Sequence, residues 1–194
     1  MKRHIIIGIR YSLLIRESKS WGISRGSNFD NYENQLFSNE RMIVRESIFT
    51  AVTLKSLQYL NKCKDNDVEF KVFILTSESL PERNKRFIEN VASENPFIEL
   101  KFYPPENVNL NLHLIDYVNE NVGNNEPYAS VRLDDDDALS IEWLKETTKF
   151  LQPCFSNMML SLSNGLAVLV NKEGGIEKIS HYKYRLLGAG LTYI

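Results

Sequence analysis

The chain has 194 residues, of which 43% are hydrophobic and 25% are charged, and this composition is typical of one globular domain. Its formal net charge of −2 argues against broad electrostatic binding to nucleic acid or to anionic lipid, because such binding needs a basic face. The two cysteines, Cys63 and Cys154, form no CxxC pair and indicate neither a disulfide framework nor a zinc site.

The first residues resemble the start of a secretory signal, but two features oppose this interpretation. Arg10 and Arg16 interrupt the apolar run, and no small-residue cleavage site follows. No apolar stretch approaches the roughly 18 residues that a membrane helix needs. We therefore expect a cytoplasmic protein without a transmembrane segment.

The first third of the chain is predicted to hold a strand, a loop and a helix. Residues 4–10 are continuous and rich in β-branched side chains, which is typical of a central strand. Residues 17–34 are polar and predict a functional or partly disordered loop, in which Trp21 would either stack on a ligand or pack into the core. Residues 40–61 gather apolar side chains on one face and predict a helix.

Strands and helices continue to alternate up to the middle of the chain. Residues 68–76 predict a second strand, and the capping-box pattern from Ser79 to Glu82 predicts the start of a helix. Residues 97–103 predict a third strand and are followed by another helical stripe. Residues 128–133 predict a fourth strand that runs directly into four aspartates. This alternation favours a mostly parallel sheet with helices on its faces.

The pattern changes after the aspartates. Ser140 is a candidate N-cap for a helix that ends near Leu151. Asn164 and Gly165 lie between two apolar runs and predict a two-residue hairpin turn, because both residue types tolerate a positive φ. The predicted fold class is therefore α/β, with a mostly parallel central sheet flanked by helices and a C-terminal hairpin region.

The run Asp134-Asp135-Asp136-Asp137 is the feature that points to chemistry. Two carboxylates at about 4 Å repel each other by about 1 kcal/mol in water and by more at lower dielectric. An exposed acidic run is the ordinary alternative, but this run follows a predicted strand, where α/β proteins bind ligands. In an extended chain, Asp134 and Asp136 would point to one side and Asp135 and Asp137 to the other. Mn²⁺ or Mg²⁺ would offset the repulsion and hold a diphosphate.

Residues 132–139, Arg-Leu-Asp-Asp-Asp-Asp-Ala-Leu, resemble the RLDxDDAL signature of the putative rhamnosyltransferase family within the GT-A glycosyltransferases. Residues 45–58 are similar to the first-helix pattern of that family, and residues 8–11 are similar to the end of its first strand. Residues 162–165 resemble its hairpin motif. The resemblance thus spans residues 5–170.

This resemblance implies a GT-A-like, Rossmann-related fold, a nucleotide-diphosphate-sugar donor and a bound Mn²⁺ or Mg²⁺. By position, Asp134 would face the ribose or base, and Asp136 would bind the metal with support from Asp137. Arg132 would either pair with the diphosphate or brace the aspartates, and Arg45 would be either a surface arginine or a functional one. The implied cofactor-binding residues are Arg10, Tyr11, Arg132, Asp134 and Asp135, and the implied metal ligands are Asp136 and Asp137.

One domain would then span residues 1–194, with a nucleotide-sugar-binding half at 1–137 and an acceptor-side half at 138–194 that takes a glycan or lipid-linked acceptor. We expect the second half to be incomplete, because no recognisable general-base motif follows the aspartates. The available groups are Glu142, Glu146, Glu173, Glu177 and His181.

Two alternatives to the glycosyltransferase remain open from the sequence. The first is a non-catalytic remnant that binds a nucleotide or a sugar. The second is another Mg²⁺-dependent enzyme of phosphoryl or nucleotidyl transfer, although residues 8–14 contain no Asp to act as a phosphatase nucleophile.

Overall fold

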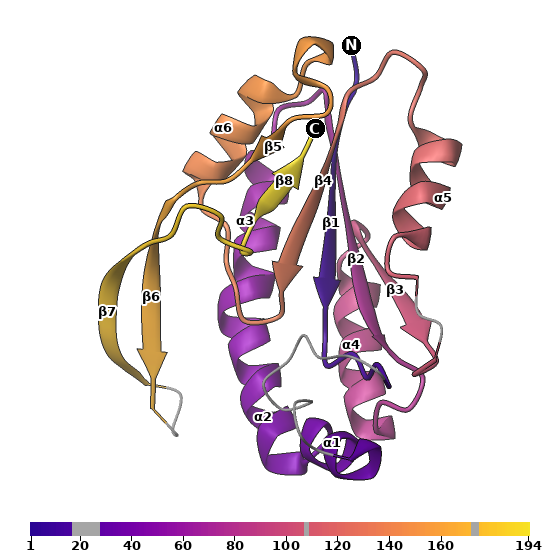
Figure 1. Ribbon diagram of the computed structural model, residues 1–194, viewed down its shortest axis with the longest axis vertical. Helices are drawn as coiled ribbons and strands as arrows, with labels where there is room; N and C mark the ends of the chain where they lie inside the picture. Colours follow the sequence, from indigo (N-terminus) through magenta and orange to yellow (C-terminus); the bar gives the residue numbers. More distant parts are fainter. Residues whose placement is uncertain (17–27, 107–108, 172–174) are drawn as a thin grey trace.

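The computed structural model describes residues 1–16, 28–106, 109–171 and 175–194. Its centre is a six-stranded sheet in the order β3-β2-β1-β4-β8-β5, in which the first four of these strands are parallel and β8 runs antiparallel to both of its neighbours, β4 and β5. The predicted α/β class and mostly parallel sheet are therefore confirmed (Figure 1). The strands are β1 (Arg3–Arg10), β2 (Val68–Ser77), β3 (Ile98–Tyr103), β4 (Tyr128–Asp134), β5 (Met159–Leu160) and β8 (Leu191–Tyr193).

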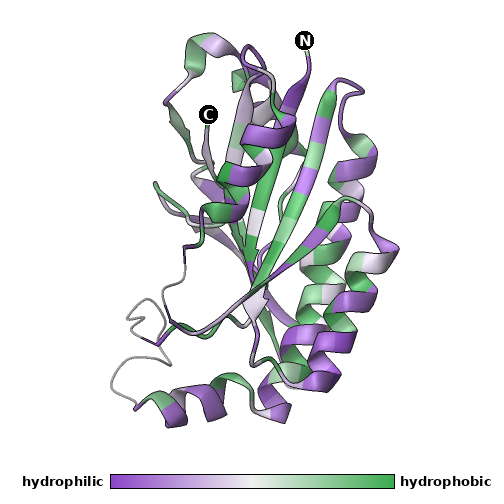
Figure 2. Ribbon diagram, turned by 90° about the vertical axis from the view of Figure 1, so that its right-hand side faces the viewer, coloured by the Kyte–Doolittle hydropathy of each residue, from purple (hydrophilic) through white to green (hydrophobic). Residues whose placement is uncertain are grey.

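Helices cover both faces of this sheet, but unequally. The main core lies on the face that carries Ile5, Ile7 and Ile9 of β1, and it takes buried side chains from α2 (Asn39–Ile48), α3 (Lys55–Cys63), α4 (Glu82–Glu94) and α6 (Ile141–Phe150). The other face carries Ile6 and is covered by α5 (Leu112–Asn121). Alternate residues of β1 thus serve two cores, as the pleat of a strand requires. Figure 2 shows the apolar strands between helices whose outer faces are hydrophilic.

The predicted helix at 40–61 is part of a longer helical run. Between α2 and α3 lies a π-helical segment, η2 (Phe49–Leu54), so that helical residues continue from 39 to 63. Its wider turns hold Phe49, Thr53 and Leu54 in buried positions. A π segment inside an α-helix is uncommon and is frequent at functional sites.

The loop predicted for residues 17–34 is wrong in its second part. Residues 17–27 lie outside the described residues, whereas α1 (Phe29–Leu36) begins just after them. The side chain of Asn28 caps this helix by accepting from the amide of Asn31 at 2.9 Å, and Tyr32 and Leu36 are buried. In Figure 1, α1 lies beyond the carboxyl ends of the parallel strands. The prediction for Trp21 lies outside the described residues.

The two predicted helix caps have different outcomes. Ser140 caps α6 as predicted, because its hydroxyl accepts from the amide of Trp143 at 3.2 Å. The capping box at Ser79 is wrong, since Pro81 is the N-cap of α4 and its carbonyl accepts from the amides of Asn84 and Lys85. Proline fixes the φ needed there, so the helix begins two residues later than the sequence pattern indicated.

The C-terminal region contains a hairpin, but its turn is elsewhere. The hairpin joins β6 (Asn164–Val170) to β7 (Ile176–Lys183), and Asn164 pairs with Lys183 at its open end. The predicted turn at Asn164 and Gly165 is therefore wrong, because Met159 and Leu160 pair with β8 instead of folding back on β6. A short 3₁₀ helix, η3 (Pro153–Phe155), connects α6 to β5. Figure 1 shows the β6–β7 hairpin standing apart from the central sheet.

Candidate functional site

From β1 the sheet is extended first on one side, by β2 and β3, and then on the other side, by β4. The carboxyl ends of β1 and β4 are therefore the switch point of the sheet. Arg10 ends β1 and Asp134 ends β4, and the two residues are register partners. The guanidinium of Arg10 donates to Asp134 Oδ1 from Nε at 3.0 Å and from Nη2 at 2.6 Å. Arg132, two residues earlier on β4, places Nη2 at 3.8 Å from Asp134 Oδ2. Asp134 therefore lies between two arginines at the edge where α/β sheets bind ligands.

The aspartates after β4 form a tight turn rather than an extended strand. The amide of Asp137 donates to the carbonyl of Asp134 at 3.1 Å, and this bond closes the segment into what we call the acidic turn, residues 134–137. The expected alternation of side chains is therefore wrong beyond Asp134. Asp135 is buried, whereas Asp136 is exposed, and their neighbours Asp134 and Asp137 are half-buried.

Arg45 of α2 reaches across to the acidic turn. Its Nη2 donates to Asp135 Oδ1 in a short contact, and its Nη1 donates to Asp136 Oδ2 at 2.7 Å. One guanidinium thus bridges two consecutive carboxylates, a geometry that its rigid fork of donors favours. The interaction holds the turn against the mutual repulsion of its charges.

Two hydroxyl groups from the same helical run fix the backbone of this region. Thr53, in the π segment, donates to the carbonyl of Asp135 at 3.1 Å. Ser56, one turn later, accepts from the amide of Leu139 at 3.4 Å. Both the side chains and the backbone of the acidic turn are therefore held by residues 45–56.

Burial and crowding shift the electrostatics of the turn. Burial raises the pKa of Asp135 to about 6, while the guanidinium of Arg45 acts in the opposite direction. Burial and the charges of Asp136 and Asp134 raise the pKa of Asp137 to about 6 as well. Burial lowers the pKa of Arg45, but Asp135 and Asp136 outweigh this effect and raise it above its usual value. At pH 7 the ion pairs of the turn are consequently formed.

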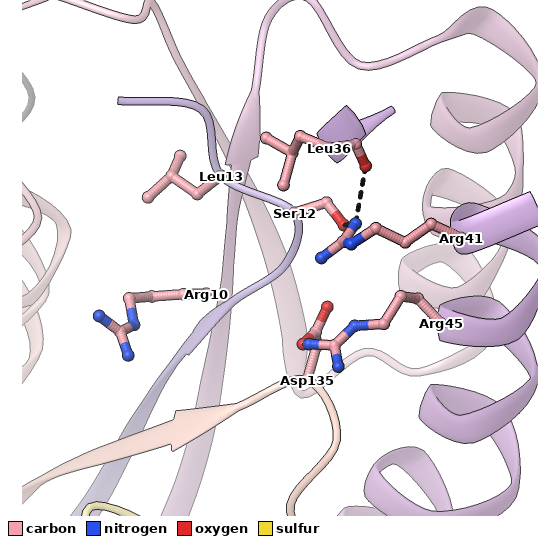
Figure 3. A pocket seen from close by; sticks show the side chains of 7 residues that line it. All are labelled: Arg10, Ser12, Leu13, Leu36, Arg41, Arg45 and Asp135. Carbon is pink, nitrogen blue, oxygen red and sulfur yellow. Dashed lines mark hydrogen bonds and ion pairs between the residues drawn. The ribbon is translucent and has the colours of Figure 1, made fainter. Parts of the chain in front are cut away.

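A pocket lies directly beside the turn and is mostly positive. It is a small hollow that is partly open to solvent, so it can enclose only a small part of a ligand such as a nucleotide. Figure 3 shows Arg41 and Arg45 reaching into it from α2, with Asp135 between the helix and the end of β1. Its lining residues are Arg10, Ser12, Leu13, Leu36, Arg41, Arg45 and Asp135.

Ser12 shapes this pocket through an unusual backbone. Its φ of 43° lies in the left-handed region, which non-glycine residues seldom adopt and which is concentrated at functional sites. Arg41 Nη1 stabilises this conformation by donating to Ser12 Oγ at 3.1 Å and to the carbonyl of Leu36 at 2.7 Å. The chain therefore leaves β1 sharply and opens the switch point.

Tyr11, the other strand-end residue singled out from the sequence, has a different environment. Its side chain is fully buried in the main core, edge-on to Phe49 with ring centroids 5.4 Å apart. Burial, with smaller effects from Glu46 and Asp135, raises the pKa of its hydroxyl above the usual range. The structure thus brings together Arg10, Arg132, Asp134, Asp135, Asp136 and Asp137, and it places the ring of Tyr11 beneath them.

The acidic turn fits a divalent cation only in part. Among the described residues, no group of three or more His, Cys, Asp or Glu side chains is arranged to hold a metal ion. Mg²⁺, however, usually takes one or two carboxylates together with substrate phosphates and waters. Asp136 and Asp137 supply such a pair of oxygen donors, and the arginine-lined pocket adjoins them. The residues present therefore fit an ion that is shared with a phosphate ligand, not an ion held by protein alone.

None of the downstream acid–base candidates that the structure describes joins this site. Glu146 pairs with Lys149 at 2.5 Å on the surface of α6. Glu177 and His181 lie exposed on β7, and His181 pairs in register with Leu166. Glu142 is exposed in the first turn of α6, and Glu173 lies outside the described residues.

Sequence reasoning gave too little weight to α2. Arg41 and Arg45 are spaced four residues apart and so share one face of the helix, which is the signal that could have indicated a paired basic site. Ser12 and Thr53 carried no such signal, because their roles depend on a backbone conformation and on a π segment. Both are properties of the folded chain.

The fold and the site define an α/β protein whose candidate ligand site lies at the switch point of a parallel sheet and combines carboxylates with arginines. The chain matches the family model described as putative rhamnosyl transferase over residues 5–194. It therefore belongs to this family, and the family assignment made from the sequence is confirmed. The family indicates a glycosyltransferase, with a sugar donor and an acceptor. No curated protein matches the chain.

The described parts of the chain contain no helix that is both long and apolar enough to cross a membrane.

Proposed function

We propose that the chain is a metal-dependent glycosyltransferase of GT-A type that transfers a sugar from a nucleotide-diphosphate sugar to a glycan or lipid-linked acceptor. The observation that carries this proposal is the meeting of Arg10 and Asp134 with the acidic turn at the switch point of the sheet. In such sheets, this edge is where nucleotides bind. Residues 1–137 would then bind the donor, and residues 138–194 would face the acceptor.

The charges of the site suit a diphosphate that leaves as an anion. The pocket is lined by Arg10, Arg41 and Arg45, of which Arg10 pairs with Asp134 and Arg45 with Asp135 and Asp136, so a phosphate group would meet three arginines whose charge the acidic turn partly balances. Arginine binds phosphate with two parallel donors, which orients it as well as attracting it. The arginines already line the pocket in the absence of ligand, so their charges need little reorganisation during sugar transfer.

Asp136 and Asp137 would hold Mn²⁺ or Mg²⁺ together with the diphosphate. The ion would supply Lewis-acid stabilisation of the departing nucleoside diphosphate. Asp134, fixed by Arg10 at 2.6 Å, would present its remaining oxygen to the ribose or base. Arg132 would brace Asp134 from the solvent side.

Calorimetry with nucleoside diphosphates tests this function. We expect UDP, GDP, CDP or dTDP to bind in the presence of Mn²⁺ and to bind at least about tenfold more weakly in EDTA, a difference of about 1.4 kcal/mol. Asp136→Asn should lose most of the metal-dependent affinity. Asp116→Asn, which removes a carboxylate from the exposed surface of α5, is the matched control and should bind like the wild type.

Equal affinity in Mn²⁺ and in EDTA would remove the metal from the proposal. Binding of a nucleoside diphosphate without hydrolysis or transfer of the corresponding sugar would instead favour a non-catalytic binding protein. Failure of every nucleoside diphosphate to bind would overturn the proposed function.

A further inference from the structure

Arg45 makes two contacts that differ in burial. Asp135, which receives its Nη2, is 1% exposed, whereas Asp136, which receives its Nη1 at 2.7 Å, is 46% exposed. The whole side chain of Arg45 is 18% exposed. One arginine is therefore attached to the turn by a buried arm and by a solvent-facing arm.

The π segment directs this arginine and a second anchor to the same target. In a regular α-helix, residues eight apart, such as Arg45 and Thr53, would point about 80° apart around the axis. The wider turns of η2 reduce this angle, and both side chains reach Asp135, Arg45 at its carboxylate and Thr53 at its carbonyl. The geometry of the helix thus directs the side chain of Arg45 toward Asp135.

The two arms have unequal costs of release. Loss of the buried arm would leave the Asp135 carboxylate without a counter-charge in a dry environment, which is strongly unfavourable. Loss of the exposed arm costs little, because Asp136 is accessible to water and to cations, which can replace the guanidinium as its counter-charge. The structure therefore separates a permanent interaction from an exchangeable one.

We propose that Arg45 is a positioning residue that acts as the built-in counter-ion of the acidic turn: its Asp135 arm keeps the turn folded, and its Asp136 arm is exchanged for the divalent cation. This inference rests on the proposed function, because it assumes that Asp136 is a metal ligand. The guanidinium and the cation then compete for one carboxylate. The metal alone binds weakly, and the turn keeps its shape in the absence of metal.

Binding of Mn²⁺ alone, followed by the EPR signal of the free ion, tests the competition without any nucleotide. Arg45→Met on its own would strand the buried carboxylate, so it is compared in the Asp135→Asn background, which has no such charge. We expect Arg45→Met/Asp135→Asn to bind Mn²⁺ about two- to fivefold more tightly than Asp135→Asn, because the cation no longer has to displace an exposed ion pair of up to about 1 kcal/mol. Comparable melting temperatures of the two proteins establish that both are folded.

Arg41→Met in the same background is the matched control. Arg41 lies one turn earlier on α2 and carries the same charge, but it donates to Ser12 and Leu36 rather than to the acidic turn. Its removal should raise Mn²⁺ affinity by less than the removal of Arg45. If both variants gained Mn²⁺ affinity equally, the gain would come from the lost positive charge alone, and the inference would be overturned. An unchanged Mn²⁺ affinity in the Arg45 variant would overturn it as well.

Arg45→Lys in the otherwise wild-type chain supplies a second variant whose folding is safer. An ammonium satisfies the buried Asp135 but cannot bridge both carboxylates, so Mn²⁺ affinity should again rise, and an unchanged affinity would contradict the exchange. Failure of this inference is distinct from failure of the proposed function. If Mn²⁺ binding does not depend on Asp136, the proposed metal site is wrong. If it depends on Asp136 but not on Arg45, only the inference is wrong.

Discussion

The acidic turn and the β6–β7 hairpin are both loops of chain attached to the same sheet, yet they are stabilised in opposite ways. The turn is charged and receives contacts from residues far away in the sequence, namely Arg10, Arg45 and Thr53. The hairpin is largely apolar, and its strands pair only with each other. Most of its large apolar side chains are exposed, from 43% at Tyr182 to 66% at Ile176.

The difference teaches that polarity alone does not decide what a residue contributes to stability. A carboxylate at Asp135 is costly to disturb, because it is buried with a fixed partner, whereas a valine at Val168 is cheap to change, because water already reaches it. The following predictions test this contrast between a region held by tertiary contacts and one held by local pairing.

The largest expected effect is at Arg45. Arg45→Met should lower the free energy of unfolding by about 3–5 kcal/mol, because the substitution leaves the buried Asp135 carboxyl without its counter-charge. Urea unfolding at pH 7 measures the loss. Arg86→Met, which breaks only an exposed pair with Glu82 on α4, should change stability by less than about 0.5 kcal/mol. Similar losses in the two variants would show that the acidic turn is not held as described.

The next effect is a dependence on pH at His113, behind the sheet. Burial, and to a smaller extent Lys101, lowers the pKa of His113 to about 4 from the usual 6.5. Since the folded state prefers the neutral imidazole, its stability is complete above pH 6.5 and is lost as the pH falls toward 4. Wild type should therefore lose about 2 kcal/mol more than His113→Asn between these pH values. Parallel stability curves in urea would contradict this role.

Gly190 should give a loss of about 1–3 kcal/mol when it becomes alanine. Its φ is +73°, and an added Cβ would lie 2.6 Å from Leu139 and 3.1 Å from Trp143, so the substitution adds both backbone strain and a clash just beyond the acidic turn. Gly165→Ala in the hairpin is the control, because a Cβ there meets nothing within 4 Å. Thermal unfolding of the two variants compares the regions directly.

The smallest effect is expected in the hairpin itself. Val168→Ala should change the free energy of unfolding by less than about 0.5 kcal/mol, because the side chain is 49% exposed and pairs only with Ile179 across the strands. Ile74→Ala on β2, where the side chain is fully buried, should cost about 2–5 kcal/mol under the same conditions. A large loss at Val168 would mean that the hairpin packs against a partner in solution, and the comparison would fail.

The sequence predicted the parallel strands well, because each is a compact apolar segment whose pattern depends on few neighbours. It also placed Asp134 correctly at a carboxyl strand edge beside Arg10. It failed at Asp135 and Asp136, since strand alternation was continued into residues whose backbone is turned by a hydrogen bond from Asp137 to Asp134. Local pattern cannot reveal where a strand stops when its last residues are all of one type.

The hairpin turn was misplaced for a related reason. Asn164 and Gly165 are typical of a two-residue turn, but β8 returns from the end of the chain to pair with Met159 and Leu160. This competing partner removes the strand that the turn would have needed. Arg45 was undervalued because its targets lie 90 and 91 residues further along the chain, beyond the reach of any helical periodicity.

The central place of β1 also bears on the order in which the chain folds. The first strand to be synthesised has both of its partners far ahead of it, since His4 pairs with Glu69 on one side and with Tyr128 on the other. Parallel pairing over such separations forms slowly, because the entropy of closing the intervening loops is lost before the contacts are gained. Arg10 cannot meet Asp134 until the chain has grown past β4. The edge that carries the acidic turn is therefore completed only when β4 pairs with β1, and a chain that binds phosphate at this edge has already joined all four of its parallel strands.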